Sequence, residues 1–122
     1  MTRIWLAIAG LAGLASVMAG ALAAHLETDP RTAELLRTGA WYGMVHAAAL
    51  IAIIALAQGR EPRRGPATIA GWSFAAGIVL FSGSLFALAA GAGRWLGWIA
   101  PVGGAALMLG WGALAVLALR RR

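Results

Sequence analysis

Four long runs of apolar residues fill most of this chain, at residues 4–24, 39–57, 67–92 and 95–119. Each run is close to the roughly 20 residues that a helix needs to cross about 30 Å of hydrocarbon. No run alternates apolar and polar positions with a period of two, as the wall of a membrane β-barrel does. The pattern therefore predicts an all-α membrane protein, an antiparallel four-transmembrane-helix bundle that forms a single membrane domain over residues 1–122.

The composition agrees with a membrane location. Hydrophobic residues make up 61% of the 122 residues and charged residues only 11%, whereas soluble domains carry about 25% charged residues. The chain has no cysteine and no lysine. Disulfide bonds, thiol nucleophiles and Schiff-base chemistry are therefore excluded.

The arginines are distributed unevenly between the two sides of the membrane. With four spans, both chain ends and the loop between the second and third spans share one side. That side carries Arg3, Arg60, Arg63, Arg64, Arg120, Arg121 and Arg122, whereas the other side carries only Arg31, Arg37 and Arg94. Short arginine-rich segments stay in the cytoplasm. We therefore expect a bacterial inner-membrane protein with cytoplasmic N- and C-termini. The net charge of +6 then comes from arginines that set the topology, and we expect no nucleic-acid partner.

The first apolar run also admits a second interpretation. Met1–Arg3 followed by apolar residues and Ala21-Leu22-Ala23 resembles a secretory signal peptide with a small-residue cleavage site. The run is longer than the usual apolar core of about 7–15 residues in such signals, and it carries small residues at helix-packing spacing. We expect it to be retained as a span, with cleavage as the alternative.

Small residues predict where the helices touch, because helices in lipid associate through close backbone approach. The positions expected to pack are Gly20, Gly43, Gly83, Pro101, Gly103 and Gly104. Proline lacks an N–H, so Pro101 is expected to leave the carbonyl of Gly97 free within the fourth span. Asp29-Pro30 is expected to cap a helix that continues into the second span.

Few polar side chains lie within the spans. His25, His46, Ser82 and Ser84 are predicted to form a polar cluster in the outer half of the bilayer. His46 is either a proton-carrying or ligand-binding group, or a neutral imidazole bonded to Ser84 or to a freed carbonyl. Trp111, deep in the fourth run, is expected to be a packing residue, whereas the other tryptophans lie near span ends, where the headgroup zone favours them.

Catalytic and metal-binding constellations are not expected. The two histidines lack a paired spacing, and no carboxylate shares the depth of His46. No aspartate is placed to orient a histidine base for Ser82 or Ser84. We therefore predict no catalytic residues, no metal site and no cofactor.

Several stretches resemble a known family. They are Leu80-Phe81-Ser82-Gly83-Ser84-Leu85-Phe86, the set Gly97, Ile99, Pro101, Gly103 and Gly104, the pair Gly110-Trp111, the stretch 20–25, and Tyr42 with His46-Ala47. They resemble domain-of-unknown-function family 423, also called uncharacterised protein family 0382 or YgdD-like. The chain departs from that pattern at Ala23-Ala24, where the family has Gly-Ala, and at Ala100, where it has Thr. The resemblance implies a small inner-membrane protein with four helices and an uncleaved start, and it implies no activity.

These observations favour a non-enzymatic accessory or structural bundle that binds a partner protein or lipid. The expected partners are the lipid bilayer and either another membrane protein or a second copy of this chain. The alternative is a small dimeric proton-coupled transporter. Small exporters of this size use a glutamate in the first span, which this chain lacks, so His46 would have to replace it. A haem-binding quinone or electron-transfer subunit is a third hypothesis.

Overall fold

The computed structural model describes residues 1–56 and 65–120, and within them it is all-α. Four helical segments are long and apolar enough to cross a membrane: Thr2–His25, Pro30–Leu56, Pro66–Ala89 and Arg94–Leu119. The predicted fold class, a membrane bundle of four helices, is confirmed. Several expected features lie outside the described residues, namely Ala57 at the end of the second run and Arg60, Arg63, Arg64, Arg121 and Arg122.

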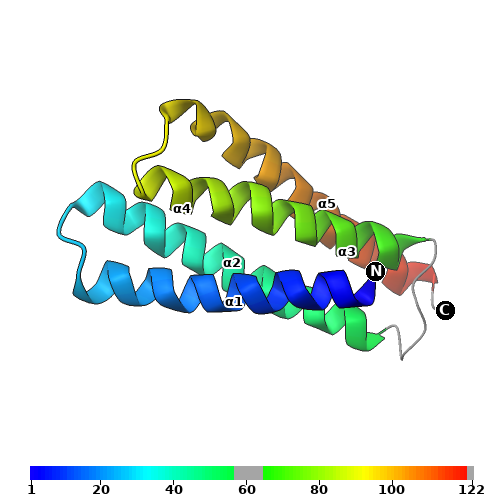
Figure 1. Ribbon diagram of the computed structural model, residues 1–122. Helices are drawn as coiled ribbons and strands as arrows, with labels where there is room; N and C mark the ends of the chain where they lie inside the picture. Colours follow the sequence, from blue (N-terminus) through cyan, green and yellow to red (C-terminus); the bar gives the residue numbers. More distant parts are fainter. Residues whose placement is uncertain (57–64, 121–122) are drawn as a thin grey trace.

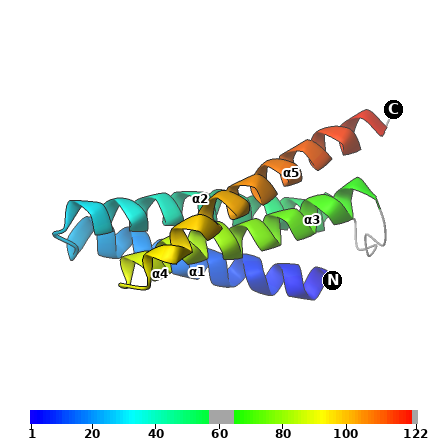
Figure 2. The ribbon, with the colours of Figure 1, turned by 90° about the horizontal axis from the view of Figure 1, so that it is seen from above.

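The four segments run antiparallel in chain order (Figure 1). Helix α1 (Thr2–His25) lies beside α2 (Pro30–Leu56); the third segment consists of α3 (Pro66–Gly77), a π-helical stretch η1 (Ile78–Ser82) and α4 (Gly83–Ala89). A 3-10 helix η2 (Arg94–Trp98) then leads into α5 (Ile99–Arg120). Figure 2 shows α5 crossing the third segment and diverging from the bundle toward its C-terminal end.

Met1 lies at the same end of the bundle as the last turn of α5 (Figures 1 and 2). We call this the terminal end. The connection between α1 and α2 and the one between α4 and η2 lie at the opposite end, which we call the turn end. This arrangement is the one expected for an even number of spans.

The start of α2 is capped as predicted. The backbone N–H and the hydroxyl of Thr32 both donate to Asp29 Oδ2, at 2.8 Å and 2.7 Å. These two hydrogen bonds hold the pKa of the Asp29 carboxyl below its ordinary value. Arg37, two turns into α2, donates from Nη2 to the carbonyl of Ala23 at 3.3 Å. The cap and this second bond fix the turn end of α2 against the end of α1.

The third segment contains a feature that the hydrophobic pattern did not predict. Its helix widens at Ile78–Ser82, where the N–H of Gly83 donates to the carbonyl of Ile78, five residues earlier. The widened turn lies against Gly103 of α5, because a side chain at Gly103 would overlap the backbone nitrogen of Phe81. Gly103 therefore allows the backbones of α5 and the third segment to touch. Such a turn depends on the neighbouring helix, and for that reason periodicity alone does not reveal it.

Pro101 does not interrupt a continuous helix, in contrast to the prediction. The chain enters the fourth segment through η2, and α5 begins only at Ile99. Pro101 therefore lies in the first turn of α5, where backbone N–H groups have no intrahelical acceptor in any case. Its side chain is exposed. Pro101 was predicted to pack helices near the outer start of the fourth span, and this prediction is corrected to a helix-starting role.

The glycines predicted to pack helices divide into two groups. A methyl group at Gly43 or Gly103 would overlap a neighbouring helix, and one at Gly104 would lie 3.8 Å from Phe81. At Gly20 and Gly83 it would meet no atom within 4 Å. The prediction for Gly20 and Gly83 is therefore wrong in the described structure, since a four-residue spacing does not indicate which helix face meets a neighbour. Other glycines that a methyl group would force against side chains are Gly39, Gly71, Gly77 and Gly110.

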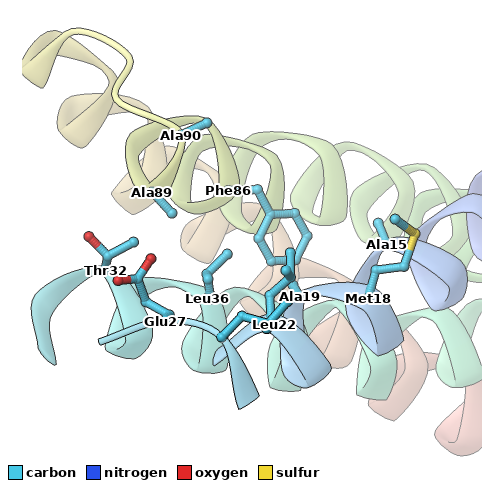
Figure 3. A pocket seen from close by; sticks show the side chains of 11 residues that line it. Ala15, Met18, Ala19, Leu22, Glu27, Thr32, Leu36, Phe86, Ala89 and Ala90 are labelled. Atoms are coloured by element: carbon cyan, nitrogen blue, oxygen red, sulfur yellow. The ribbon is translucent and has the colours of Figure 1, made fainter. Parts of the chain in front are cut away.

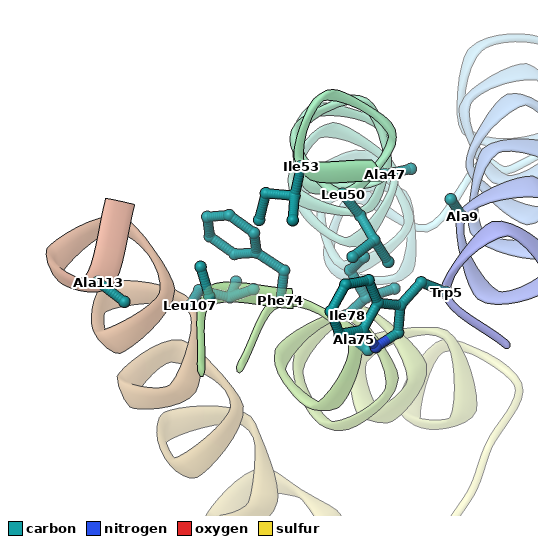
Figure 4. Close-up of a cluster of buried hydrophobic side chains, with 11 residues drawn as sticks. Trp5, Ala9, Ala47, Leu50, Ile53, Phe74, Ala75, Ile78, Leu107 and Ala113 are labelled. Atoms are coloured by element: carbon teal, nitrogen blue, oxygen red, sulfur yellow. The ribbon is translucent and has the colours of Figure 1, made fainter. Parts of the chain in front are cut away.

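A core of large and small apolar side chains joins all four segments (Figure 4). Trp5 is fully buried, with its ring against Gly71 and 5.9 Å from the ring of Trp72. It was expected among the headgroups because it lies near a span end, but its face of α1 points into the bundle. Phe74 lies at the centre of the cluster and contacts the Cα region of Gly110 on α5.

Candidate functional site

The first polar site joins α2 to α5 through His46. His46 is 5% exposed, and its Nδ1 lies 2.7 Å from the carbonyl oxygen of Tyr42, one turn earlier. Its Nε2 accepts a hydrogen bond of 3.0 Å from the indole N–H of Trp111. A carbonyl can only accept and an indole N–H can only donate. The imidazole is therefore neutral, with its proton on Nδ1, and both ring nitrogens are satisfied.

Aromatic rings surround this histidine. The ring of Tyr42 stacks on it at 5.9 Å, and Phe74 and Trp111 lie 5.6 Å and 6.0 Å away. Phe74 and Trp111 also meet edge to face at 5.2 Å. Trp111 is 48% exposed, so it lies at the surface of the bundle while its indole N–H reaches His46. We refer to His46, Tyr42, Phe74 and Trp111 as the His46 junction.

The partner and the depth of His46 differ from the prediction. It bonds Trp111 instead of Ser84, whose hydroxyl donates to the carbonyl of Phe81 in its own helix at 2.9 Å. It lies nearer the Leu56 end of α2 than the Pro30 end, at the level of Phe74 and about one helical turn from Gly43, which borders Ser82. The misplacement arose because α2 begins at Pro30, well before the apolar run that was used to measure depth.

His25 is not part of a cluster with the other three residues. It is the last residue of α1 and is exposed at the turn end, where a basic side chain suits the negative end of the helix dipole. The four predicted residues therefore do not form one cluster. His25 is at the surface, His46 is at the α2–α5 contact, Ser84 is bonded to its own helix, and Ser82 lies in a separate site.

Ser82 belongs to a second polar site, together with Ser16 of α1. Both are buried, at 3% and 1% exposure, and neither hydroxyl has a hydrogen-bond partner. Both border Gly43 of α2: a methyl group there would overlap Ser16 Oγ and lie 3.2 Å from Ser82 Oγ. Since both oxygens lie so close to one point, they are within about two hydrogen-bond lengths of each other. We refer to Ser16, Gly43 and Ser82 as the serine site.

The serine site forms part of the wall of a groove. A cavity of about 250 Å³ between α1 and the third segment is lined by both serines, by Gly43 and by apolar side chains such as Leu11 and Ile78. Ala15 and Phe86 line this cavity and also a second one of about 450 Å³, which continues toward the turn end. The two cavities therefore adjoin along α1 and α4, and we refer to them together as the groove. Taken together, their volume lies in the range of small-molecule sites, about 300–1,000 Å³.

Figure 3 shows the part of the groove that lies toward the turn end. Phe86 projects from α4 toward Ala19 and Leu22 of α1, and Met18 lies farther along α1. The walls are apolar except at the mouth, where Glu27 and Thr32 lie. The Glu27 carboxylate accepts the N–H of Asp29 at 2.8 Å. The groove thus offers apolar walls, an acidic group toward the turn end and two buried hydroxyls partway along its length.

Neither polar site has the composition of a metal centre. Within residues 1–56 and 65–120, no three His, Cys, Asp or Glu side chains come together in a group that could hold a metal ion. The sequence did not single out Ser16 beyond its place in a stripe of small residues, and it assigned Trp111 to packing alone. The feature that could have identified Trp111 as a hydrogen-bonding residue is its indole N–H, a donor that needs an acceptor inside a membrane span.

Comparison with known proteins gives a consistent result. The model of the family described as "Protein of unknown function (DUF423)" matches residues 19–104. A UPF0382 membrane protein of Haemophilus influenzae is 37% identical over 118 residues, which cover 94% of this chain and 93% of that protein. The UPF0382 membrane protein YwdK of Bacillus subtilis is 36% identical over 121 residues, 97% of this chain and 98% of the relative.

The UPF0382 inner membrane protein YgdD of Escherichia coli is 34% identical over 128 residues, which cover 98% of this chain and 92% of that protein. No solved structure matches the chain. With a family model that matches most of the chain, full-length relatives that are named membrane proteins, and four helices able to span a bilayer, this chain is a membrane protein that belongs to the DUF423 family.

Proposed function

We propose that this protein is a non-enzymatic accessory protein of the bacterial inner membrane that binds a lipophilic molecule in the groove between α1 and α4. The observation that carries the proposal is the groove itself, two joined cavities of about 250 and 450 Å³ with apolar walls. Most pockets for small molecules are concave, apolar and supplied with a few polar groups. A groove with this lining offers a lipid tail a continuous apolar contact.

The orientation is part of the proposal. The E. coli relative YgdD is called an inner membrane protein, and the arginine distribution favours cytoplasmic termini. The turn end then faces outward, and the mouth of the groove at Glu27 and Thr32 opens near the outer surface of the membrane. A partner protein that inserts a helix into the same groove is the competing occupant.

The geometry of His46 counts against the proton-coupled transporter. Protonation would place a second N–H on the imidazole, directed at the indole N–H of Trp111, 3.0 Å away. The donors would then oppose each other, and Trp111 would lose its acceptor in a low-dielectric environment. We therefore assign His46 to the contact between α2 and α5.

The proposal is tested by native mass spectrometry of the protein after gentle extraction from its own membrane. We expect a retained lipophilic molecule and an intact mass that begins at Met1, as a retained first span requires. In Ala15→Phe, which fills the point where the two cavities join, the adduct should be lost. Ala21→Phe is the matched control, since Ala21 is exposed on the same helix and lines neither cavity.

An adduct retained equally by the two variants would contradict a ligand in the groove. A retained protein in place of a lipid, lost only in Ala15→Phe, would identify the competing occupant. Bare protein from both the wild type and Ala21→Phe would refute the proposed function.

A further inference from the structure

We propose that the serine site selects the ligand of this groove, and that the ligand is a neutral lipid without a charged headgroup that carries a carbonyl oxygen deep in the membrane, as a prenyl quinone does. This inference rests on the proposed function, because it specifies the chemistry of the molecule that the groove binds. It is carried by two buried hydroxyls that have no partner and line the groove.

The first step is the state of the two hydroxyls. Ser16 and Ser82 do not bond to a carbonyl of their own helices or to each other, whereas Ser84 does bond to its helix. Within a membrane, a hydroxyl ordinarily bonds back to its helix or across to another. Two unpaired hydroxyls beside the same glycine therefore point to a polar partner that the described part of the bundle does not supply.

The second step is the space available for that partner. Gly43 has no side chain, and both hydroxyls pack so closely against this bare backbone position that a methyl group there would overlap Ser16 Oγ. The hydroxyl oxygens expose almost no surface in this structure. Ligand binding therefore requires each serine to rotate about χ1 to another staggered position, so that its hydroxyl faces the cavity that both residues line. One carbonyl oxygen has two lone pairs and can accept from both hydroxyls.

The third step is depth. Ser16 lies about 13 Å along α1 from His25 at the turn end, at about 1.5 Å per residue. The hydrocarbon core is about 30 Å thick, and the polar groups of phospholipids lie outside it. The ester carbonyls of a membrane-anchored phospholipid therefore stay nearer the surface than the serine site. A lipid without a charged headgroup can place a carbonyl at this depth.

The fourth step is charge. The only ionisable group among the residues that line the two joined cavities is Glu27 at the mouth. A carboxylate there disfavours an anionic ligand, and none of the described residues that line these two cavities is a cation able to bind a phosphate. The apolar walls instead suit an isoprenoid or alkyl tail.

The test is a titration of the full-length protein in phosphatidylcholine nanodiscs, read by native mass spectrometry. The two probes are geranyl-1,4-benzoquinone and geranylbenzene, which share a tail and a six-membered ring and differ in the two carbonyl groups. We expect the quinone to bind more tightly. Ser16→Ala and Ser82→Ala should each weaken quinone binding about fivefold, the loss of roughly one hydrogen bond, and leave geranylbenzene binding unchanged.

Ser84→Ala is the matched control, because it also removes a hydroxyl from the third segment, but one already bonded to the Phe81 carbonyl. Its quinone affinity should equal that of the wild type. Equal binding of the two probes, or an equal loss in Ser84→Ala, would overturn the serine site and leave groove binding standing. If neither probe binds and the protein also leaves its own membrane bare, both proposals fail.

Discussion

The His46 junction and the serine site are both buried polar sites in an apolar bundle, and they differ in how their hydrogen bonds are satisfied. At the junction every ring nitrogen has a partner, His46 Nδ1 with Tyr42 and Nε2 with Trp111. At the serine site the hydroxyls of Ser16 and Ser82 have none. A satisfied polar group stabilises a fold, whereas an unsatisfied one lowers its stability unless another molecule completes it. The difference separates a structural contact from a candidate binding site.

The largest effect is expected at the junction. His46→Ala removes a ring packed among Tyr42, Phe74 and Trp111 and leaves the indole N–H without its acceptor. We expect the free energy of unfolding to fall by about 2–3 kcal/mol, from a cavity and a lost hydrogen bond. Steric trapping in bicelles would measure it, with the exposed neighbour Val45→Ala as control. A change no larger than that of the control would contradict a structural role for His46.

A smaller loss is expected when only the hydrogen bond is removed. Trp111→Phe keeps an aromatic ring beside Phe74 and leaves His46 Nε2 unpaired. The expected cost is about 1 kcal/mol. The tautomer of His46 is tested in the wild-type protein. Its ¹⁵N spectra should show a proton on Nδ1 of His46 and an acceptor at Nε2. A proton on Nε2 would be inconsistent with the Trp111 bond.

The serine site should behave in the opposite way. In the ligand-free protein, Ser16→Ala and Ser82→Ala each remove an unpaired buried hydroxyl. We expect stability to stay equal or to rise by up to about 1 kcal/mol. Unfolding in bicelles depleted of neutral lipid is the appropriate measurement. A clear loss of stability in either variant would mean that the hydroxyls already have partners within the protein, and the contrast between the two sites would disappear.

The smallest effect concerns the Asp29 cap at the start of α2, where Asp29 is bonded to Glu27 and Thr32. Hydrogen bonds from Thr32 lower the pKa of Asp29, so the cap stabilises the helix above the ordinary pKa of about 3.9. This contribution is lost as pH falls through the lowered pKa. The Thr32 amide resonance should titrate with a midpoint below about 3.9, the ordinary aspartate value. A midpoint at or above that value would contradict the capping geometry.

Much of the fold followed from the sequence because lipid imposes simple rules on it. Length and apolarity predicted four helices, and Asp29-Pro30 predicted the start of α2. The π-helical turn at Ile78–Ser82 and the first-turn position of Pro101 were missed. The π-helical turn lies against another helix, with Gly103 beside Phe81, and no single-helix pattern contains such a contact.

The candidate sites were harder to predict. His46 and Ser82 were singled out as polar residues within spans, but their partners Trp111 and Ser16 come from other helices. Depth measured from the ends of apolar runs placed His46 beside Ser84, because the run begins later than α2 does. Small-residue spacing likewise could not distinguish Gly43, which touches two helices, from Gly20, which touches none.

The most direct test compares the two sites in one measurement. Native mass spectrometry gives the ligand occupancy of gently extracted protein for Trp111→Phe and for the double variant Ser16→Ala/Ser82→Ala. The account predicts that Trp111→Phe keeps the wild-type adduct despite its lower stability. The double variant should lose most of the adduct while remaining as stable as the wild type. A double variant that keeps its adduct, or loss of the adduct in Trp111→Phe alone, would contradict the assignment of binding to the serine site.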